Sequence, residues 1–337
     1  MHWQLVVNIC YIDPMKMGLI TQFVRKVVRK QKWLRNKALQ FERFLESAHN
    51  PVNTLISLAR SLTKKLNKNN TLTMRLGVAY NLFDGEELLE YSIKSIRNNV
   101  DFVCVIWQKI SYHGEKCSDG LENLLHTLME NGLIDQLYLY EPDSTHTGGE
   151  ISSFKRNIGL DLCRQHGCNY HMTIDSDEFY TDEQFRFMKE EMLRGDYGTG
   201  YCRHIQYYKD SIYQLKYPER YYVTTIEKIL PTTKYVYGIP CAVDVSPERK
   251  TTNVQNGLSC RIFSRNECEM HHLSFVRKDI AKKLRNGSLD KAFLKEEIDP
   301  VVEHYKTWKY PEKCMWAGKT LLEVIEVPRQ FEIYEID

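Results

Sequence analysis

The sequence predicts an α/β protein in which helices flank a mostly parallel sheet. From residue 74 onward, short apolar runs alternate with segments whose apolar residues recur at three- and four-residue spacing. The fourth apolar run ends at an acidic cluster, residues 175–178 (DSDE). Strands that alternate with helices form parallel βαβ units, and such sheets bind ligands beyond the carboxyl ends of their strands. We therefore expect the acidic cluster at the ligand-binding edge of the sheet.

Four strands and three helices are expected to build the first part of this sheet. The near-continuous apolar run at 102–107 is typical of a buried parallel strand. Gly132 and Gly167 are expected to end the second and third helices. The expected strands are 75–81, 102–107, 136–140 and 170–174, and the expected helices are 86–98, 121–131 and 153–165. A loop rich in Gly and Thr is expected at 144–149, before the third helix.

The remainder of the chain predicts a less regular arrangement. Residues 198–265 are rich in Tyr, Val, Ile and Thr and indicate further strands joined by long loops. Residues 277–286 and 292–308 predict two helices, the second of which we expect to break or restart at Pro300. Residues 324–336 predict a terminal extended segment.

Charge is distributed unevenly along the 337 residues, although the whole chain carries only +2. Residues 1–70 contain thirteen Lys and Arg but three Asp and Glu, so a basic appendage precedes an acidic body. We expect a basic helical extension at 1–70, a main domain at 71–290, and a helical and extended C-terminal segment at 291–337 that packs on the main domain.

The basic extension has two interpretations. Between residues 19 and 34 its apolar residues follow helical spacing and basic residues lie between them, which suits an anionic membrane surface. The same pattern suits a helical hairpin that packs on the main domain or on a second subunit of a homo-oligomer. No nucleic-acid-binding module is present, so we expect no nucleic acid partner.

Cysteine usage and hydropathy bear on the compartment. The ten cysteines form no CxxC pair, which is typical of reduced thiols in a cytosolic protein. No stretch reaches the roughly 18 apolar residues that a membrane-spanning helix needs. We expect a cytoplasmic protein, peripheral on the inner face of a membrane if the basic extension binds lipid.

The acidic cluster itself admits two interpretations. In an extended backbone, residues two apart point the same way, so Asp175 and Asp177 are expected to face one ligand together. A divalent ion that bridges a diphosphate fits such a pair of carboxylates. The alternative is a solvated acidic turn that caps the helix beginning near Thr181.

Four motifs in order resemble the GT-A glycosyltransferases, in particular the family-2-like branch of bacteria and large viruses. The similarity covers roughly residues 74–285. The motifs are residues 80–89 (YNLFDGEELL), residues 153–160 (SFKRNIGL, like the family's RN-x-G helix), residues 174–178 (IDSDE, like its DxD motif) and residues 270–277 (MHHLSFVR, like its C-terminal histidine). The sequence departs from the family in the first motif and in Gln108, which stands where a "DDGS" is common.

The resemblance implies a GT-A, Rossmann-like fold and a metal-dependent transfer of a sugar from a nucleotide donor, with UDP-sugars favoured. It implies that Asp177 is the main metal ligand, that Asp175 binds the metal or the ribose, and that His272 completes the site. The neighbouring His271 stays open as the alternative ligand. An imidazole ligand favours Mn²⁺ over Mg²⁺.

The same resemblance implies a set of donor-binding residues. Nucleotide base and ribose are expected near the strand ends, and the diphosphate near a helix start that offers cations and free N–H groups. For each residue a packing or solvated role is the alternative. The expected donor-binding residues are Tyr80, Asn81, Asp84, Gln108, Lys155, Arg156 and Asp175.

An inverting transfer also needs a carboxylate base for the acceptor hydroxyl. Asp244, Glu219 and Asp210 lie between the DxD motif and the histidines, and Asp244 is preferred because an apolar run precedes it. Each is equally compatible with an acid on a surface turn. The expected acceptor is a glycan or a lipid-linked glycan, as in polysaccharide biosynthesis.

Two other functions stay open. A sugar-nucleotide pyrophosphorylase shares the sheet type, but it predicts a GxGxR loop that residues 80–85 do not supply. A glycan-binding or scaffold protein on the same fold would lack catalysis and nucleotide binding.

Overall fold

A computed structural model describes residues 73–333, apart from residues 144, 287–290 and 317–319, and gives only the backbone of residues 291–297. Thr73–Asp337 forms one compact unit. The basic helical extension expected at 1–70 lies outside the described residues.

Four parallel strands form one half of the sheet. They are β1 (Leu76–Leu82), β2 (Phe102–Trp107), β3 (Gln136–Leu139) and β4 (Tyr170–Asp175), and they lie in the order β3-β2-β1-β4. All three pairings in this order are parallel, and Asn81 at the end of β1 stands beside Asp175 at the end of β4. The expected fold class, a mostly parallel sheet flanked by helices, is confirmed.

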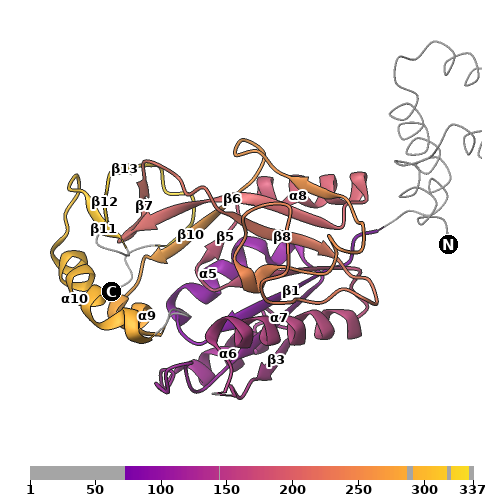
Figure 1. Ribbon diagram of the computed structural model, residues 1–337, viewed down its shortest axis with the longest axis horizontal. Helices are drawn as coiled ribbons and strands as arrows, with labels where there is room; N and C mark the ends of the chain where they lie inside the picture. Colours follow the sequence, from indigo (N-terminus) through magenta and orange to yellow (C-terminus); the bar gives the residue numbers. More distant parts are fainter. Residues whose placement is uncertain (1–72, 144, 287–290, 317–319, 334–337) are drawn as a thin grey trace, which may run out of the picture. The chain divides into compact units, whose positions relative to one another are not determined.

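Helices cover both faces of these strands (Figure 1). The helices are α5 (Glu86–Ile96), followed by the short 3-10 helix η3 (Arg97–Asn99), α6 (Leu121–Glu130), α7 (Gly148–Gln165) and α8 (Asp182–Gly195). Apolar residues of α5, α6 and α8 share a core with Val78 and Tyr80 of β1, whereas α7 packs against the opposite face, where Ala79 points. Side chains alternate between the faces of a strand, so both faces of β1 are buried.

Helix α7 begins five residues earlier than expected. The segment 144–149, expected as a loop, instead contains the N-cap Thr147, whose side chain accepts a hydrogen bond from the backbone N–H of Glu150. The Glu150 side chain in turn accepts from the backbone of Thr147. This reciprocal capping box overrides the two glycines that follow the cap. Later in α7, Gly159 lies against Ala79, where an added Cβ would come within 2.4 Å of the Ala79 Cβ.

The second half of the sheet is largely antiparallel. It contains β5 (Glu178–Phe179), β6 (Thr199–Tyr208), β7 (Asp210–Leu215), β8 (Tyr222–Lys228), β9 (Cys260–Ile262) and β10 (Glu269–Phe275). Strand β10 is central to the site, because it pairs parallel to β6 and antiparallel to β5, which places His272 opposite both Gln206 and Glu178. The long connection between β8 and β9 carries a short 3-10 helix, η4 (Pro247–Arg249).

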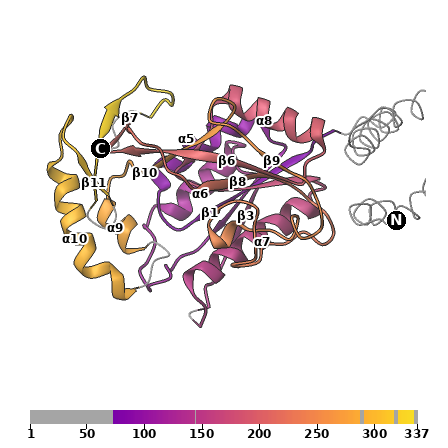
Figure 2. The same ribbon diagram turned by 45° about the horizontal axis from the view of Figure 1, so that its top comes forward.

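The C-terminal elements form one end of the unit (Figures 1 and 2). They are α9 (Ile280–Arg285), α10 (Lys291–Thr307), β11 (Cys314–Trp316), β12 (Thr320–Leu322) and β13 (Val324–Glu326). A separate aromatic core joins them to the sheet through Tyr208, Phe275 and Trp308. Helix α10 continues through Pro300 instead of breaking there as expected. None of the described helices is long and apolar enough to cross a membrane.

Candidate functional site

The carboxyl end of β4 borders a cleft of about 540 Å³. Its floor comes from β6 and β10, whose registered residues His204, Gln206, Met270 and His272 face the same side. The end of β4 forms one wall, and two loops, around residues 219–222 and 244–250, form the rest. The cleft is lined by Asp175, Glu178, His204, Gln206, Glu219, Tyr221, Tyr222, Val223, Asp244, Val245, Ser246, Pro247, Glu248, Arg249, Lys250, Met270 and His272.

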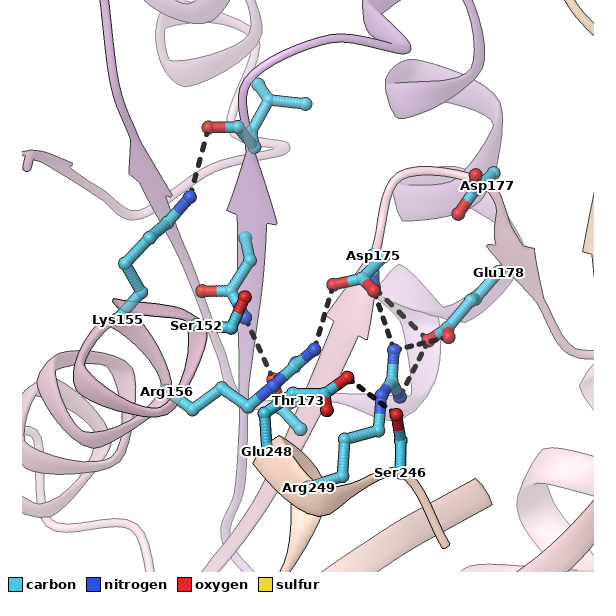
Figure 3. A network of polar contacts seen from close by, with 12 residues as sticks. Ser152, Lys155, Arg156, Thr173, Asp175, Asp177, Glu178, Ser246, Glu248 and Arg249 are labelled. Carbon is cyan, nitrogen blue, oxygen red and sulfur yellow. Dashed lines mark hydrogen bonds and ion pairs between the residues drawn. The ribbon is translucent and has the colours of Figure 1, made fainter. Parts of the chain in front are cut away.

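Asp175 is held by two arginines (Figure 3). Its Oδ2 accepts a hydrogen bond from Nη2 of Arg249 at 2.8 Å, and its Oδ1 lies 3.4 Å from Nη2 of Arg156. Arg249 is buried and also donates to both carboxylate oxygens of Glu178, at 3.1 Å and 2.5 Å. A guanidinium that binds two carboxylates in this way fixes their orientation, because its donors form a rigid planar fork.

The two acids that share Arg249 differ in their proton affinity. Burial tends to raise the pKa of Asp175, but the charges of Arg156 and Arg249 prevail and lower that pKa to about 2. For Glu178, burial prevails over the attraction of Arg249 and raises the pKa. Asp175 therefore binds a proton less readily than Glu178 does.

Asp177 points away from this pair (Figure 3). It lies instead in a second cluster of cations. Its Oδ2 accepts hydrogen bonds from Nη2 of Arg277 at 2.5 Å and from Nζ of Lys283 at 2.9 Å. Its Oδ1 lies 3.6 Å from Nε2 of His272. Burial opposes the ionised form, but Lys283, Arg277 and His272 hold the pKa of Asp177 well below its usual range.

The expectation that Asp175 and Asp177 face one ligand together is wrong for this backbone. A turn at residues 176 and 177 separates β4 from β5, so the alternation of an extended strand does not apply there. The carboxylates consequently point to different cation clusters. In the part of the chain that the structure describes, no three His, Cys, Asp or Glu side chains are grouped to hold a metal ion.

Two of the three expected metal ligands nevertheless fit a divalent ion. Asp177 Oδ1 and His272 Nε2 face each other, and the buried Nδ1 of His272 has no hydrogen-bond partner among the described residues. One carboxylate and one imidazole suffice for an ion that takes its remaining ligands from phosphate and water. Asp175 fits poorly, because each of its oxygens is bound to an arginine.

The structure separates the two adjacent histidines. His272 lines the cleft, whereas His271 points to the other face of β10, where it is buried against Phe331 and its Nδ1 lies 2.8 Å from the Tyr207 hydroxyl. Burial lowers the pKa of His271 to about 4, so it stays neutral. His271 is therefore excluded as the alternative metal ligand.

Lys155 and Gln108 form a buried pair behind the edge of the sheet. The Lys155 Nζ donates to the Gln108 side-chain oxygen at 3.1 Å and to the backbone carbonyl of Leu82 at 3.4 Å. Lys155 is 2% exposed and has no carboxylate in hydrogen-bond reach among the described residues. Burial lowers its pKa to about 7, although the charge of Asp175 acts against this.

Of the other expected donor-binding residues in and after β1, Asn81 and Asp84 lie near the edge of the sheet and Tyr80 lies in the core. Asn81 lies at the edge, and its buried side-chain oxygen has no partner among the described residues. Asp84 follows on the loop, where its carbonyl accepts a hydrogen bond from Ser176. Tyr80 is fully buried under α5 with its hydroxyl 3.1 Å from Ser92, so the structure does not bring it to the cleft.

Two of the three candidate bases line the cleft. Asp244 and Glu219 both face it, and neither side chain has a hydrogen bond or ion pair within the described residues. Asp210 does not line it, because it pairs with Arg329 beside β7. From the sequence, Asp244 was preferred and Glu219 and Asp210 were alternatives.

Three of the cations that hold the acidic cluster, Arg249, Arg277 and Lys283, were not predicted from the sequence. Arg277 stands at the end of the histidine motif and Lys283 lies six residues beyond it. Their proximity to that motif could have indicated that they belong to the site. Arg249 ends the short η4 in the long connection between β8 and β9, whose sequence has no recognisable pattern. Gln206 and His204 alternate along β6, which places both on the cleft face once the strand is known.

Comparisons with known proteins give distant similarities. Neither a family model nor a curated protein matches the chain. Among solved structures, S. aureus TarS is similar at 12% identity and a TM-score of 0.39, over 65% of this chain and 41% of that one. Residues 1–349 of TarS with UDP-GlcNAc are 11% identical over 69% of this chain and 72% of that one, with a TM-score of 0.38.

A third similar structure is GalNAc-T7 with UDP, GalNAc and Mn²⁺, at 11% identity and a TM-score of 0.32, over 41% of this chain and 24% of that one. This chain thus spans 41% of the full TarS structure. All of these TM-scores are low, so the fold class rests on the strand order and pairing described above.

Proposed function

We propose that the protein is a glycosyltransferase of the GT-A type that moves a sugar from a nucleotide donor, preferably a UDP-sugar, to a glycan or a lipid-linked glycan. The observation that carries the proposal is that a cationic region and a cleft with free carboxylates lie next to each other at one edge of the sheet. Asp177 lies there among cations, and the adjacent cleft presents Glu219 and Asp244 without ion-pair partners in the described part of the chain.

The cationic region suits the donor diphosphate. Arg277 and Lys283 contact Asp177, while Lys155 and Arg156 lie behind the ends of β1 and β4. Such fixed cations stabilise the negative charge that develops on a leaving diphosphate without a cost in reorganisation. The unpartnered oxygen of Asn81 is an acceptor for a ribose hydroxyl or a base N–H.

A divalent ion would be held by Asp177 and His272 together with phosphate oxygens, with Mn²⁺ preferred to Mg²⁺. When bound, such an ion supplies Lewis-acid stabilisation of the diphosphate. Asp175 would orient Arg156 and Arg249 rather than serve as a ligand, because both of its oxygens are already bound.

The acceptor is proposed to bind in the cleft, where a carboxylate accepts the proton of its hydroxyl in an inverting transfer. Asp244 and Glu219 are the candidates for this role. Asp244 is exposed at the cleft and Glu219 is half-buried, so both are reachable by a substrate.

Nucleotide binding and donor hydrolysis test this proposal. Calorimetry of the full chain with UDP is expected to detect binding that strengthens when Mn²⁺ is added. A screen of nucleotide sugars is expected to identify at least one that the protein hydrolyses slowly without acceptor. If no nucleotide binds with or without metal, the proposal is wrong, and the alternative of a non-catalytic glycan-binding protein is favoured.

The basic segment 1–70 is proposed to bind an anionic membrane surface, which would bring a lipid-linked acceptor to the cleft. Sedimentation of the full chain with phosphatidylserine vesicles tests this. Binding is expected at low salt and its loss at high salt, and no binding at low salt would refute it.

A further inference from the structure

The cleft beside the acidic cluster differs sharply in charge from the region around Asp177. Five carboxylates line it but only two permanent cations, Arg249 and Lys250. Arg249 is already engaged by Asp175 and Glu178. The lining acids that remain are Glu219, Asp244 and Glu248, and Lys250 is the one remaining lysine or arginine of the lining.

A buried amide at the floor of the cleft points to a ligand independently of this charge. Gln206 is 6% exposed and lines the cleft, and its side-chain oxygen is buried without a hydrogen-bond partner among the described residues. An unsatisfied buried acceptor is costly unless something donates to it. A hydroxyl group of a bound ligand would supply that donor.

Aromatic side chains complete the lining. Tyr221 is 54% exposed and lines the cleft, so its ring is available to a ligand. Tyr222 beside it is fixed in place by Arg203, whose guanidinium stacks on the ring at 4.3 Å and donates to its hydroxyl at 2.9 Å. An open aromatic ring packs well against the C–H face of a sugar.

We infer that this cleft is an acceptor subsite for an uncharged, hydroxyl-rich glycan end, and that it rejects glycans that carry phosphate, sulfate or carboxylate groups. The inference rests on the proposed function and adds the chemical class of the acceptor. Anionic groups are repelled because Glu219, Asp244 and Glu248 outnumber the free cations, and like charges brought together across a binding site strongly oppose association. The anionic donor is accommodated on the other side of Asp175 and His272, where the cations lie.

The cleft is large enough for such a ligand. Its volume of about 540 Å³ falls within the roughly 300–1,000 Å³ of small-molecule sites. The terminal part of an oligosaccharide fits this space, whereas the remainder of a longer chain would extend past Tyr221 into solvent.

A glycan array tests the inference with the full chain in the presence of UDP. The array carries matched sets of neutral glycans and their sulfated, phosphorylated and carboxylated counterparts. Retention on neutral glycans, with loss on their anionic counterparts, is expected. Retention on anionic glycans in preference to neutral ones, or on no glycan at all, would overturn it.

Two variants examine the residues that carry the inference. Gln206→Met removes the unsatisfied amide and keeps the side-chain length nearly constant, so we expect unchanged or higher stability. Glycan retention is expected to weaken about tenfold, which corresponds to the loss of one hydrogen bond. A purely structural role of Gln206 would instead lower stability and leave retention unchanged. Gln214→Met on β7, outside the cleft lining, is the matched control.

Glu248→Lys reverses one charge of the cleft wall. It is expected to shift retention toward the anionic glycans, while the same change at the exposed Glu141, outside the lining, leaves the pattern unaltered. An unchanged preference in Glu248→Lys would count against the electrostatic argument. Calorimetry with UDP on the same samples separates the two proposals, because absent UDP binding refutes the glycosyltransferase whatever the array shows.

Discussion

The imidazole Nε2 of His272 lies 3.6 Å from Oδ1 of Asp177, although the two residues are far apart in the sequence. Strand β10 makes this contact, because it pairs with β5, which begins at Glu178, the last residue of the acidic cluster. On the other oxygen of Asp177, Arg277 and Lys283 supply positive charge. One carboxylate thus joins the histidine to the cations that we propose receive the diphosphate.

Replacement of Asp177 by Asn is expected to lower donor turnover at least about 100-fold, since it removes a charged ligand and frees Arg277 and Lys283 to move. Metal-stimulated hydrolysis of a UDP-sugar measures this. Asp161→Asn, which alters an exposed carboxylate on α7, is the matched control and should retain wild-type turnover. Turnover within twofold of wild type in a folded Asp177→Asn protein would contradict the proposed role.

Arg249→Met is expected to destabilise the protein by about 3–5 kcal/mol, because it leaves the buried Glu178 and part of Asp175 without their shared cation. Urea unfolding followed by circular dichroism measures the change. The double variant Arg249→Met/Glu178→Leu should recover part of the loss. Arg186→Met, which breaks an exposed pair with Asp182, should alter stability by no more than about 0.5 kcal/mol. An equally small effect of Arg249→Met would show that the network is not structural.

Gly159→Ala is expected to lower the free energy of unfolding by about 1–3 kcal/mol. The added methyl would come within 2.4 Å of the Ala79 Cβ and 3.1 Å of Ile106 Cδ1. Displacement of α7 should also move Lys155 and Arg156, so UDP binding is expected to weaken together with stability. Gly120→Ala, where the new methyl meets nothing within 4 Å, is the control and should cost less. Equal stability of both variants would refute the close approach of α7 and β1.

The stability of the protein should depend on pH through Lys155. Burial lowers its pKa from 10.5 to about 7, so between these values the unfolded chain binds more protons than the folded one, and stability rises with pH. Between pH 7 and 10.5, the free energy of unfolding of the wild type should therefore rise relative to that of Lys155→Met by up to about 1.4 kcal/mol per pH unit. Urea unfolding at pH 7, 8 and 9 measures the difference. A constant difference would indicate that Lys155 titrates normally.

Glu227 should have the opposite pH dependence. It accepts hydrogen bonds from Tyr235 at 2.5 Å and from Thr251 at 2.6 Å, and burial raises its pKa from 4.5 to about 7. The folded state holds the extra proton, so its stabilising effect is complete below pH 4.5 and is lost as pH rises toward 7. Glu227→Gln should therefore gain stability relative to the wild type over this range, as thermal unfolding at pH 4.5, 6 and 7.5 would reveal. The exposed Glu183→Gln should show no such trend.

The local sequence determined the parallel half of the sheet and the position of its ligand edge. Apolar runs and helical spacing are short-range patterns, so β2 and β4 were predicted within one residue of their observed ends. The placement of Asp175 at the end of β4 followed from the same patterns. The start of α7 was missed, because the capping box at Thr147 outweighed the glycines that had indicated a loop.

Only the tertiary structure decided how the candidate site is arranged. The turn after Asp175 sends Asp177 in another direction, and this depends on the pairing of β5 with the distant β10. The same pairing brings His272 to the edge and buries His271. Arg249 reaches the cluster from a long loop that has no periodicity, so no local pattern could place it. Contacts between distant segments are fixed by packing and ion pairing in the folded chain, and the sequence pattern around each segment does not encode them.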